Sequence, residues 1–134
     1  MLPAVAFEHL VRQLLETMSY TAFVTAPGPD SGFDIDASRF DPKIGIIRTV
    51  VEAKRYSKAI EAEVVQSLYG VMLHEKAQEA LAVTTSWFTP AAKRFAEGKP
   101  IRLIEGPELI ELIKEHLGVD VVISVERPTG RPAE

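Results

Sequence analysis

The fold expected for this chain is decided by the stretch Val50-Val51-Glu52-Ala53-Lys54-Arg55-Tyr56. It completes a run rich in β-branched residues that starts near Ile44, and such residues favour strands, so we predict a strand ending here. Side chains alternate between the two faces of a strand, so Glu52 and Lys54 share one face. A carboxylate and an ammonium fixed two residues apart can serve phosphodiester hydrolysis, the carboxylate by binding a divalent cation and the lysine by orienting or deprotonating the attacking water. Glu-x-Lys is also common on solvated edge strands, so a second segment has to support this interpretation.

That second segment is Phe33-Asp34-Ile35-Asp36, which places both aspartates on one strand face. The turn signal Asp41-Pro42-Lys43 lies between the two segments. A hairpin folded about Lys43 would put Asp34 directly opposite Glu52, whereas a shift of two residues would bring Asp34 opposite Val50. Carboxylates directly across a strand pair repel each other. The first register therefore predicts a cation between them, and Mg²⁺ held by one or two carboxylates, waters and substrate phosphate fits that role.

These motifs resemble the Mrr-type catalytic domain of the PD-(D/E)XK nuclease superfamily. The resemblance rests on the combination of motifs and covers the chain from about Phe7 to Leu117. Ser31 departs from the family pattern, where Asp or Gly is more usual beside the glycine, and this affects the turn rather than the metal ligands. The motifs that carry the resemblance are Phe7-Glu8, Ser19-Tyr20, Gly32-Phe33-Asp34-Ile35-Asp36, Val51-Glu52-Ala53-Lys54-Arg55-Tyr56, Val65-Gln66-Ser67-Leu68-Tyr69-Gly70, Val83-Thr84-Thr85-Ser86 and Ile101-Arg102-Leu103-Ile104-Glu105-Gly106.

The resemblance implies a metal-dependent DNA endonuclease of the restriction type, with a product that carries a 5′-phosphate. Asp34, Glu52 and the backbone carbonyl of Ala53 would hold Mg²⁺, for which Mn²⁺ could substitute. It also offers Glu8 as an additional metal or water ligand, against the simpler interpretation of a solvated helix residue. Lys54 would orient the water and stabilise the developing charge.

Four further polar residues are candidates for the same site. Gln66 is expected near the start of a helix and close to the end of the Glu52–Lys54 strand, where its amide could hold a water or a phosphate oxygen. Arg48, Arg55 and Lys58 are expected to contact DNA phosphates. The alternative for Gln66 is a polar surface position, and for the three cations it is a role in solubility.

The composition is that of an ordinary soluble domain. The length of 134 residues suits one domain, and we expect it over residues 1–126, followed by a flexible tail over residues 127–134. The absence of cysteine rules out disulfides and fits a cytoplasmic protein. No apolar run is long enough to span a membrane, and the N-terminus lacks a secretion signal.

The net charge of −4 argues against a chain whose main task is to coat DNA. It does not argue against a nuclease, because bound cations offset active-site acids. It predicts weak DNA affinity for this domain alone, and leaves open a separate or fused targeting domain and a homodimer.

We predict a single α/β domain with a restriction-endonuclease-like architecture, in which helices flank a central mixed sheet in the order αβββαβαβα. A Holliday-junction resolvase of the same superfamily and a non-catalytic DNA-binding or assembly module with the nuclease fold are the alternatives. A helix from Thr89 and Pro90 is expected to end at Gly98, and a final edge strand or partner-binding segment is expected over Val119–Val125. The other expected elements are helices at 4–18, 60–78 and 107–117, and strands at 20–24, 35–37, 44–56, 80–84 and 101–104.

Overall fold

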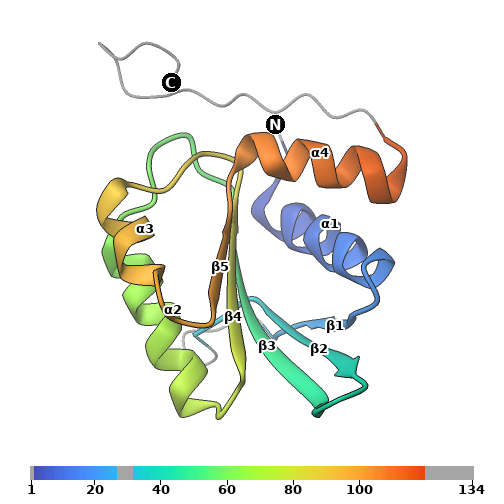
Figure 1. The fold of residues 1–134 in the computed structure, drawn as a ribbon. Coiled ribbons are helices and arrows are strands. Elements are labelled where there is room, and N and C mark those ends of the chain that lie inside the picture. The colour runs from blue at the N-terminus through green and yellow to red at the C-terminus, as the bar shows by residue number, and fades with distance from the viewer. Residues whose placement is uncertain (1, 27–31, 120–134) are drawn as a thin grey trace.

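The computed structural model describes residues 2–26 and 32–119. The described elements follow the predicted order αβββαβαβα, so the fold class is confirmed (Figure 1). In chain order the elements are α1 (Ala4–Thr17), β1 (Thr21–Val24), β2 (Ile35–Asp41), β3 (Gly45–Lys54), α2 (Ala62–His74), β4 (Glu79–Thr84), α3 (Pro90–Ala96), β5 (Ile101–Ile104) and α4 (Gly106–Leu117). No helix in the described part of the chain combines the length and apolar character that crossing a membrane requires.

The five strands form one mixed sheet in the order β1-β2-β3-β4-β5. β1, β2 and β3 pair antiparallel, and β3, β4 and β5 pair parallel. In the β2–β3 hairpin, Ile35 lies opposite Val51 and Asp36 lies opposite Val50. This is the register predicted from a turn about Lys43, and it brings Asp34, just before β2, level with Glu52.

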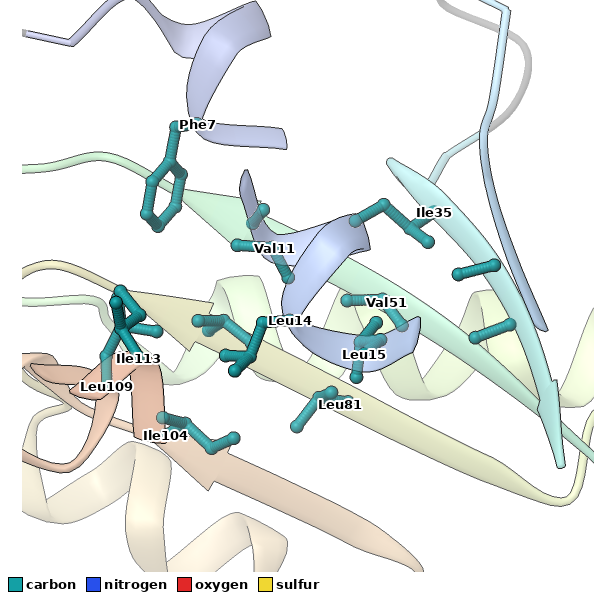
Figure 2. Close-up of a cluster of buried hydrophobic side chains, with 14 residues drawn as sticks. Phe7, Val11, Leu14, Leu15, Ile35, Val51, Leu81, Ile104, Leu109 and Ile113 are labelled. Carbon is teal, nitrogen blue, oxygen red and sulfur yellow. The ribbon is translucent and has the colours of Figure 1, made fainter. Parts of the chain in front are cut away.

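α1 and α4 cover one face of the sheet (Figure 1). α1 buries a stripe at helical spacing, which is why residues 4–17 form an amphipathic helix. Figure 2 shows this stripe packed against the sheet face that carries Ile35, Val51 and Leu81, with α4 closing the cluster near Ile104. The labelled buried residues of α1 are Phe7, Val11, Leu14 and Leu15.

α2 and α3 cover the other face, over β3, β4 and β5 (Figure 1). Val50 and Ala82 face this second core from the sheet, and Val65, Leu68 and Met72 face it from α2. α3 begins as predicted, because the Thr89 side chain accepts a hydrogen bond from the Ala92 N–H and Pro90 occupies the first turn.

Several boundaries differ from the sequence-based expectation. β2 extends to Asp41, because its turn is tightened by Asp41 Oδ1, which accepts hydrogen bonds from the N–H groups of Lys43 and Ile44. α2 begins at Ala62 and ends at His74, so it is shorter at both ends than predicted. α4 ends at the expected position, with Gly118 in the left-handed conformation. Most of the expected loop at 26–32 and most of the expected segment Val119–Val125 lie outside the described residues.

Candidate active site

The candidate site lies where β3 ends, at the carboxyl edge of the parallel half of the sheet. In α/β sheets, ligand sites typically form outside the carboxyl ends of parallel strands. Strand alternation directs Glu52 and Lys54 to the face covered by α2. The hairpin register adds Asp34 from the neighbouring segment, so the three residues predicted from sequence lie together.

Asp34 is fixed by the backbone of the strand beside it. Its Oδ2 accepts a hydrogen bond from the Ala53 N–H at 2.8 Å, while its own N–H donates to the Val51 carbonyl at 2.8 Å. Thr25 adds a third tie, since its hydroxyl donates to the carbonyls of Phe33 and Asp34. The backbone of Asp34 is therefore held on both sides, and its carboxylate is fixed by the Ala53 N–H of β3.

Glu52 and Lys54 form an ion pair on β3, with Lys54 Nζ 3.1 Å from Glu52 Oε2. The side chain of Glu52 is only 15% exposed, whereas that of Lys54 is 30% exposed. The Lys54 ammonium also lies 5.4 Å from the centre of the Tyr56 ring. These contacts hold the ammonium beside a buried carboxylate at the mouth of the site.

Two carboxyl groups of the site, those of Glu52 and Glu8, have raised pKa values. Burial raises the pKa of Glu52, and the negative charges of Asp34 and, more weakly, Glu8 raise it further against the opposing effect of Lys54. Burial also raises the pKa of Glu8, helped by the charge of Asp34 and a hydrogen bond to it. Glu8 of α1 thus joins the site through Asp34. Such perturbed acids in a cleft are typical of functional sites.

Burial tends to lower the pKa of Lys54, but the charge and hydrogen bond of Glu52 and the effect of Tyr56 outweigh it, so the pKa of Lys54 is raised. Lys54 is an ammonium at neutral pH.

A cleft of about 290 Å³ opens beside Glu52 and Lys54. Its opposite wall is α2, which contributes Glu63, Val64, Ser67 and Leu68, and Gly32 closes one side. Gln66 lies near the start of α2, as expected, but it is exposed and is not among the residues that line this cleft. Glu63 and Ser67 were not predicted. Their i, i+4 spacing alongside Val64 and Leu68 is the signal that could have found them.

Arg48, one of the predicted phosphate contacts, is engaged by acids of the chain itself. Its guanidinium donates to both carboxylate oxygens of Asp36 at 3.0 and 2.8 Å, and to the Glu75 carboxylate and carbonyl. Hydrogen bonding to Asp36 raises the pKa of Arg48 still further. Arg48 therefore connects β2 and β3 to the end of α2, and Asp36 is bonded to Arg48 and does not line the cleft.

The other two predicted DNA contacts follow β3. Arg55 is half-buried and is held by an interaction within the chain. Lys58 is exposed in the connection between β3 and α2. Arg55 and Lys58 therefore follow closely in sequence after Lys54, which lines the cleft. Arg48 lies earlier in β3, farther from the cleft in sequence.

The donor set fits a hard divalent cation. Within residues 2–26 and 32–119, no group of three or more His, Cys, Asp or Glu side chains is arranged to hold a metal ion by itself. Asp34 and Glu52 instead provide two carboxylates whose negative charges repel each other. Mg²⁺ suits such a pair, because it is usually bound through one or two carboxylates and keeps water and phosphate oxygens in its remaining positions.

The fold is that of the PD-(D/E)XK class of restriction-endonuclease domains. The chain belongs to the Mrr-type catalytic family, described as restriction endonuclease, whose model matches residues 2–113.

Among curated proteins, the chain is 28% identical over 114 residues to the type IV methyl-directed restriction enzyme EcoKMrr of Escherichia coli (strain K12). That match covers 82% of this chain and 38% of the relative, so the chain spans well under half of the relative's length.

Several solved structures share the fold, and among them are two restriction endonucleases. The DNA modification-dependent restriction endonuclease AspBHI matches with a TM-score of 0.71 and 22% identity, over 84% of this chain and 31% of that one. The MspJI restriction endonuclease, solved in complex with a 27-mer oligonucleotide, matches with a TM-score of 0.61 and 18% identity, over 81% of this chain and 27% of that one.

Proposed function

We propose that this chain is a divalent-metal-dependent DNA endonuclease of the restriction type. The observation that carries the proposal is that Glu52 and Lys54 line one cleft and that Asp34 is bonded to the Ala53 N–H between them, in a chain of the Mrr-type catalytic family. Phosphodiester hydrolysis needs a charge clamp on the phosphate and an oriented water, and these three side chains offer both functions.

Asp34 and Glu52 would hold the cation, with the backbone carbonyl of Ala53 as a third oxygen and Glu8 as an assisting carboxylate. A bound Mg²⁺ or Mn²⁺ would polarise the phosphate and offset the negative charge of the acids. The hydrogen bond from the Ala53 N–H to Asp34 supports this assignment, because it fixes one carboxylate while leaving further lone pairs available.

Lys54 would act as a charged donor. In the site without a cation its pKa is raised by Glu52 and Tyr56 despite burial, and an ammonium at this position would orient the attacking water and stabilise charge that develops on the phosphate. Glu63 and Ser67 face Lys54 across the cleft and offer further polar atoms for a water or a phosphate oxygen.

DNA is the proposed substrate, and Arg55 and Lys58 are the proposed phosphate contacts beside the cleft. The oligonucleotide in the MspJI complex supports a DNA partner for this fold. Phosphate neutralisation by Lys and Arg dominates DNA affinity. The net charge of −4 and the internal engagement of Arg48 leave few cations for that purpose.

The test is cleavage of supercoiled plasmid by the purified chain with Mg²⁺, with Mn²⁺, or with excess chelator, followed by labelling of the new ends. We expect nicked plasmid only with the divalent ions, and 5′-phosphates at the ends. Cleavage that persists in excess chelator would contradict the proposed metal dependence.

A further inference from the structure

The end of β4 carries three buried hydroxyl side chains that the proposed mechanism does not use. Thr84, Thr85 and Ser86 are 0%, 9% and 1% exposed. Burying a hydroxyl group costs free energy unless the group is hydrogen-bonded. All three hydroxyl groups are bonded within the chain. The partners of these groups therefore show what the segment holds in place.

Thr84 and Ser86 fix the turn that follows β4. The Ser86 N–H donates to Thr84 Oγ1 at 3.0 Å, and the two hydroxyl oxygens also lie 3.0 Å apart. A threonine oxygen that accepts from the N–H two residues further on closes a local turn of the backbone. Thr85 lies between the two residues, so this turn sets the direction of its donors.

Thr85 uses both of its donors on the segment that leaves β3. β3 and β4 pair in parallel up to Lys54 and Thr84. The Thr85 N–H then donates to the Lys54 carbonyl at 3.3 Å, and the Thr85 hydroxyl donates to the Tyr56 carbonyl at 2.9 Å. The hydroxyl group therefore holds the backbone of Tyr56 at a point where the regular strand pairing has ended.

Tyr56 in turn contacts the Lys54 ammonium. The ammonium lies over the Tyr56 ring at 5.4 Å from its centre, which is within the range of a cation–π interaction. A hydrogen bond with Tyr56 is also among the causes that raise the pKa of Lys54. In the proposed site Glu52 is a cation ligand, so its ion pair with Lys54 competes with that role. Tyr56 gives the ammonium a second contact that involves no proposed ligand.

We propose that Thr85 and Tyr56 are positioning residues for Lys54. The Thr85 hydroxyl holds the Tyr56 backbone, and the Tyr56 ring holds the Lys54 ammonium at the cleft. This inference rests on the proposed function, because it concerns the lysine that orients the attacking water. Neither residue has to touch DNA for this purpose, so their loss should lower kcat and leave KM unchanged.

NMR of the whole chain in excess chelator tests the contact itself. A proton held over an aromatic ring is shifted upfield, so the ε-protons of Lys54 should resonate upfield of those of the exposed Lys58. The shift should disappear in Tyr56→Leu, persist in Tyr56→Phe and diminish in Thr85→Val. A Lys54 signal that Tyr56→Leu leaves unchanged would overturn the proposal whatever the activity of the chain.

Plasmid nicking in Mg²⁺ tests the consequence. Tyr56→Leu should lower kcat by about 5-fold or more, the scale of one cation–π contact. Tyr56→Phe should restore most of the rate because it keeps the ring. Thr85→Val should lower kcat by about 2-fold or more, the scale of one hydrogen bond.

Thr49→Val is the matched control for Thr85→Val. Thr49 is a 2% exposed residue of β3 whose hydroxyl donates to the Glu79 carboxylate at 3.1 Å, and it does not line the cleft. Each of the two variants loses one buried hydrogen bond, so urea unfolding should show similar losses of stability. Only Thr85→Val should lower kcat, and an equal fall in both variants would overturn the positioning role of Thr85.

The double variant Lys54→Ala/Tyr56→Leu separates positioning from a general effect on the fold. If Tyr56 acts through Lys54, its removal has no further effect once Lys54 is absent, so the double variant should nick at the rate of Lys54→Ala. A further fall, or an unmodified rate in Tyr56→Leu, would overturn the positioning role. An unmodified rate in Lys54→Ala would instead overturn the proposed function, and the positioning role with it.

Discussion

Lys54 and Glu52 form one ion pair, but their removal should have different effects on cation binding. In the proposed site Glu52 is a ligand and Lys54 is not, because an ammonium has no lone pair. Lys54→Ala should therefore bind Mn²⁺ as tightly as the unmodified chain or more tightly, since one repulsive charge is lost. Glu52→Ala should lose the binding. Titration calorimetry with Mn²⁺ on both variants measures this, and loss of binding in Lys54→Ala would mean that its role is misassigned.

Glu52 should also destabilise the metal-free fold at neutral pH. Its folded-state pKa is raised, first by burial and then by Asp34, so the folded state holds its proton to higher pH than the unfolded state does. Stability is therefore lost as pH rises from the unfolded pKa through the folded one.

The isosteric change Glu52→Gln removes this penalty. Urea unfolding in the presence of chelator should show a more stable variant at pH 7, and the difference should shrink as pH falls below the unfolded pKa of Glu52. A variant less stable than the unmodified chain at pH 7 would show that the Lys54 ion pair outweighs burial and repulsion.

At the residue scale, the sequence predicted what the hairpin register controls and failed where contacts come from outside the hairpin. Asp34, Glu52 and Lys54 follow from strand alternation and one turn. The roles expected of Arg48 and Gln66 depended on where α2 lies. Arg48 is engaged by Glu75 at the end of that helix, and the helix turns Ser67 rather than Gln66 toward the cleft. The contact of Arg48 with Glu75 cannot be read from local periodicity, whereas the spacing of Glu63 and Ser67 beside Val64 and Leu68 could have indicated Ser67.

At the scale of elements, two glycines give opposite expectations for the same substitution. Gly32 has φ +73°, and a Cβ there would lie 2.9 Å from Val71 Cγ2 of α2. Gly32→Ala should destabilise the fold by about 1–2 kcal/mol, the scale for a left-handed L-residue, and should disturb the cleft that Gly32 lines. Gly70 lies within α2 with open space around it, so Gly70→Ala should stabilise by about 0.5–1 kcal/mol.

Thermal and urea unfolding of the two glycine variants give the comparison directly. A stabilised Gly32→Ala would show that the approach of this segment to α2 is looser than described, and a destabilised Gly70→Ala would place an unseen contact on α2.

The elements themselves were predictable because each carries its own local signal. Apolar spacing identified α1, Thr89-Pro90 marked the start of α3, and Gly118 marked the end of α4. The C-terminal end of α2 was misplaced, since the expected helix runs to Gln78. The structure ends the helix at His74, and the Gln78 N–H donates to the Arg48 carbonyl of β3. Tertiary contacts of this kind decide boundaries that propensity leaves open.

At the scale of the whole molecule, the acidic balance of charge should limit DNA binding. Few cations are available near the cleft, so duplex binding should be weak and its salt dependence shallow, since the slope follows the number of phosphates neutralised. Fluorescence anisotropy of a labelled duplex across a salt series measures the slope. Tight, sequence-specific binding by the chain at physiological salt would contradict this expectation.

The nicking rate of supercoiled plasmid by the unmodified chain, Lys54→Ala and Asp36→Asn, compared in Mg²⁺ at equal protein concentration, tests the central claim most directly. Asp36 shares the strand face of Asp34 but is bonded to Arg48 outside the cleft, so Asp36→Asn is the matched control and should keep most of the activity. Lys54→Ala should fall by about 100-fold or more, the scale for losing a positioned catalytic group. If Lys54→Ala cuts at the unmodified rate, Glu52 and Lys54 are an ordinary charged strand face and the proposed active site is wrong.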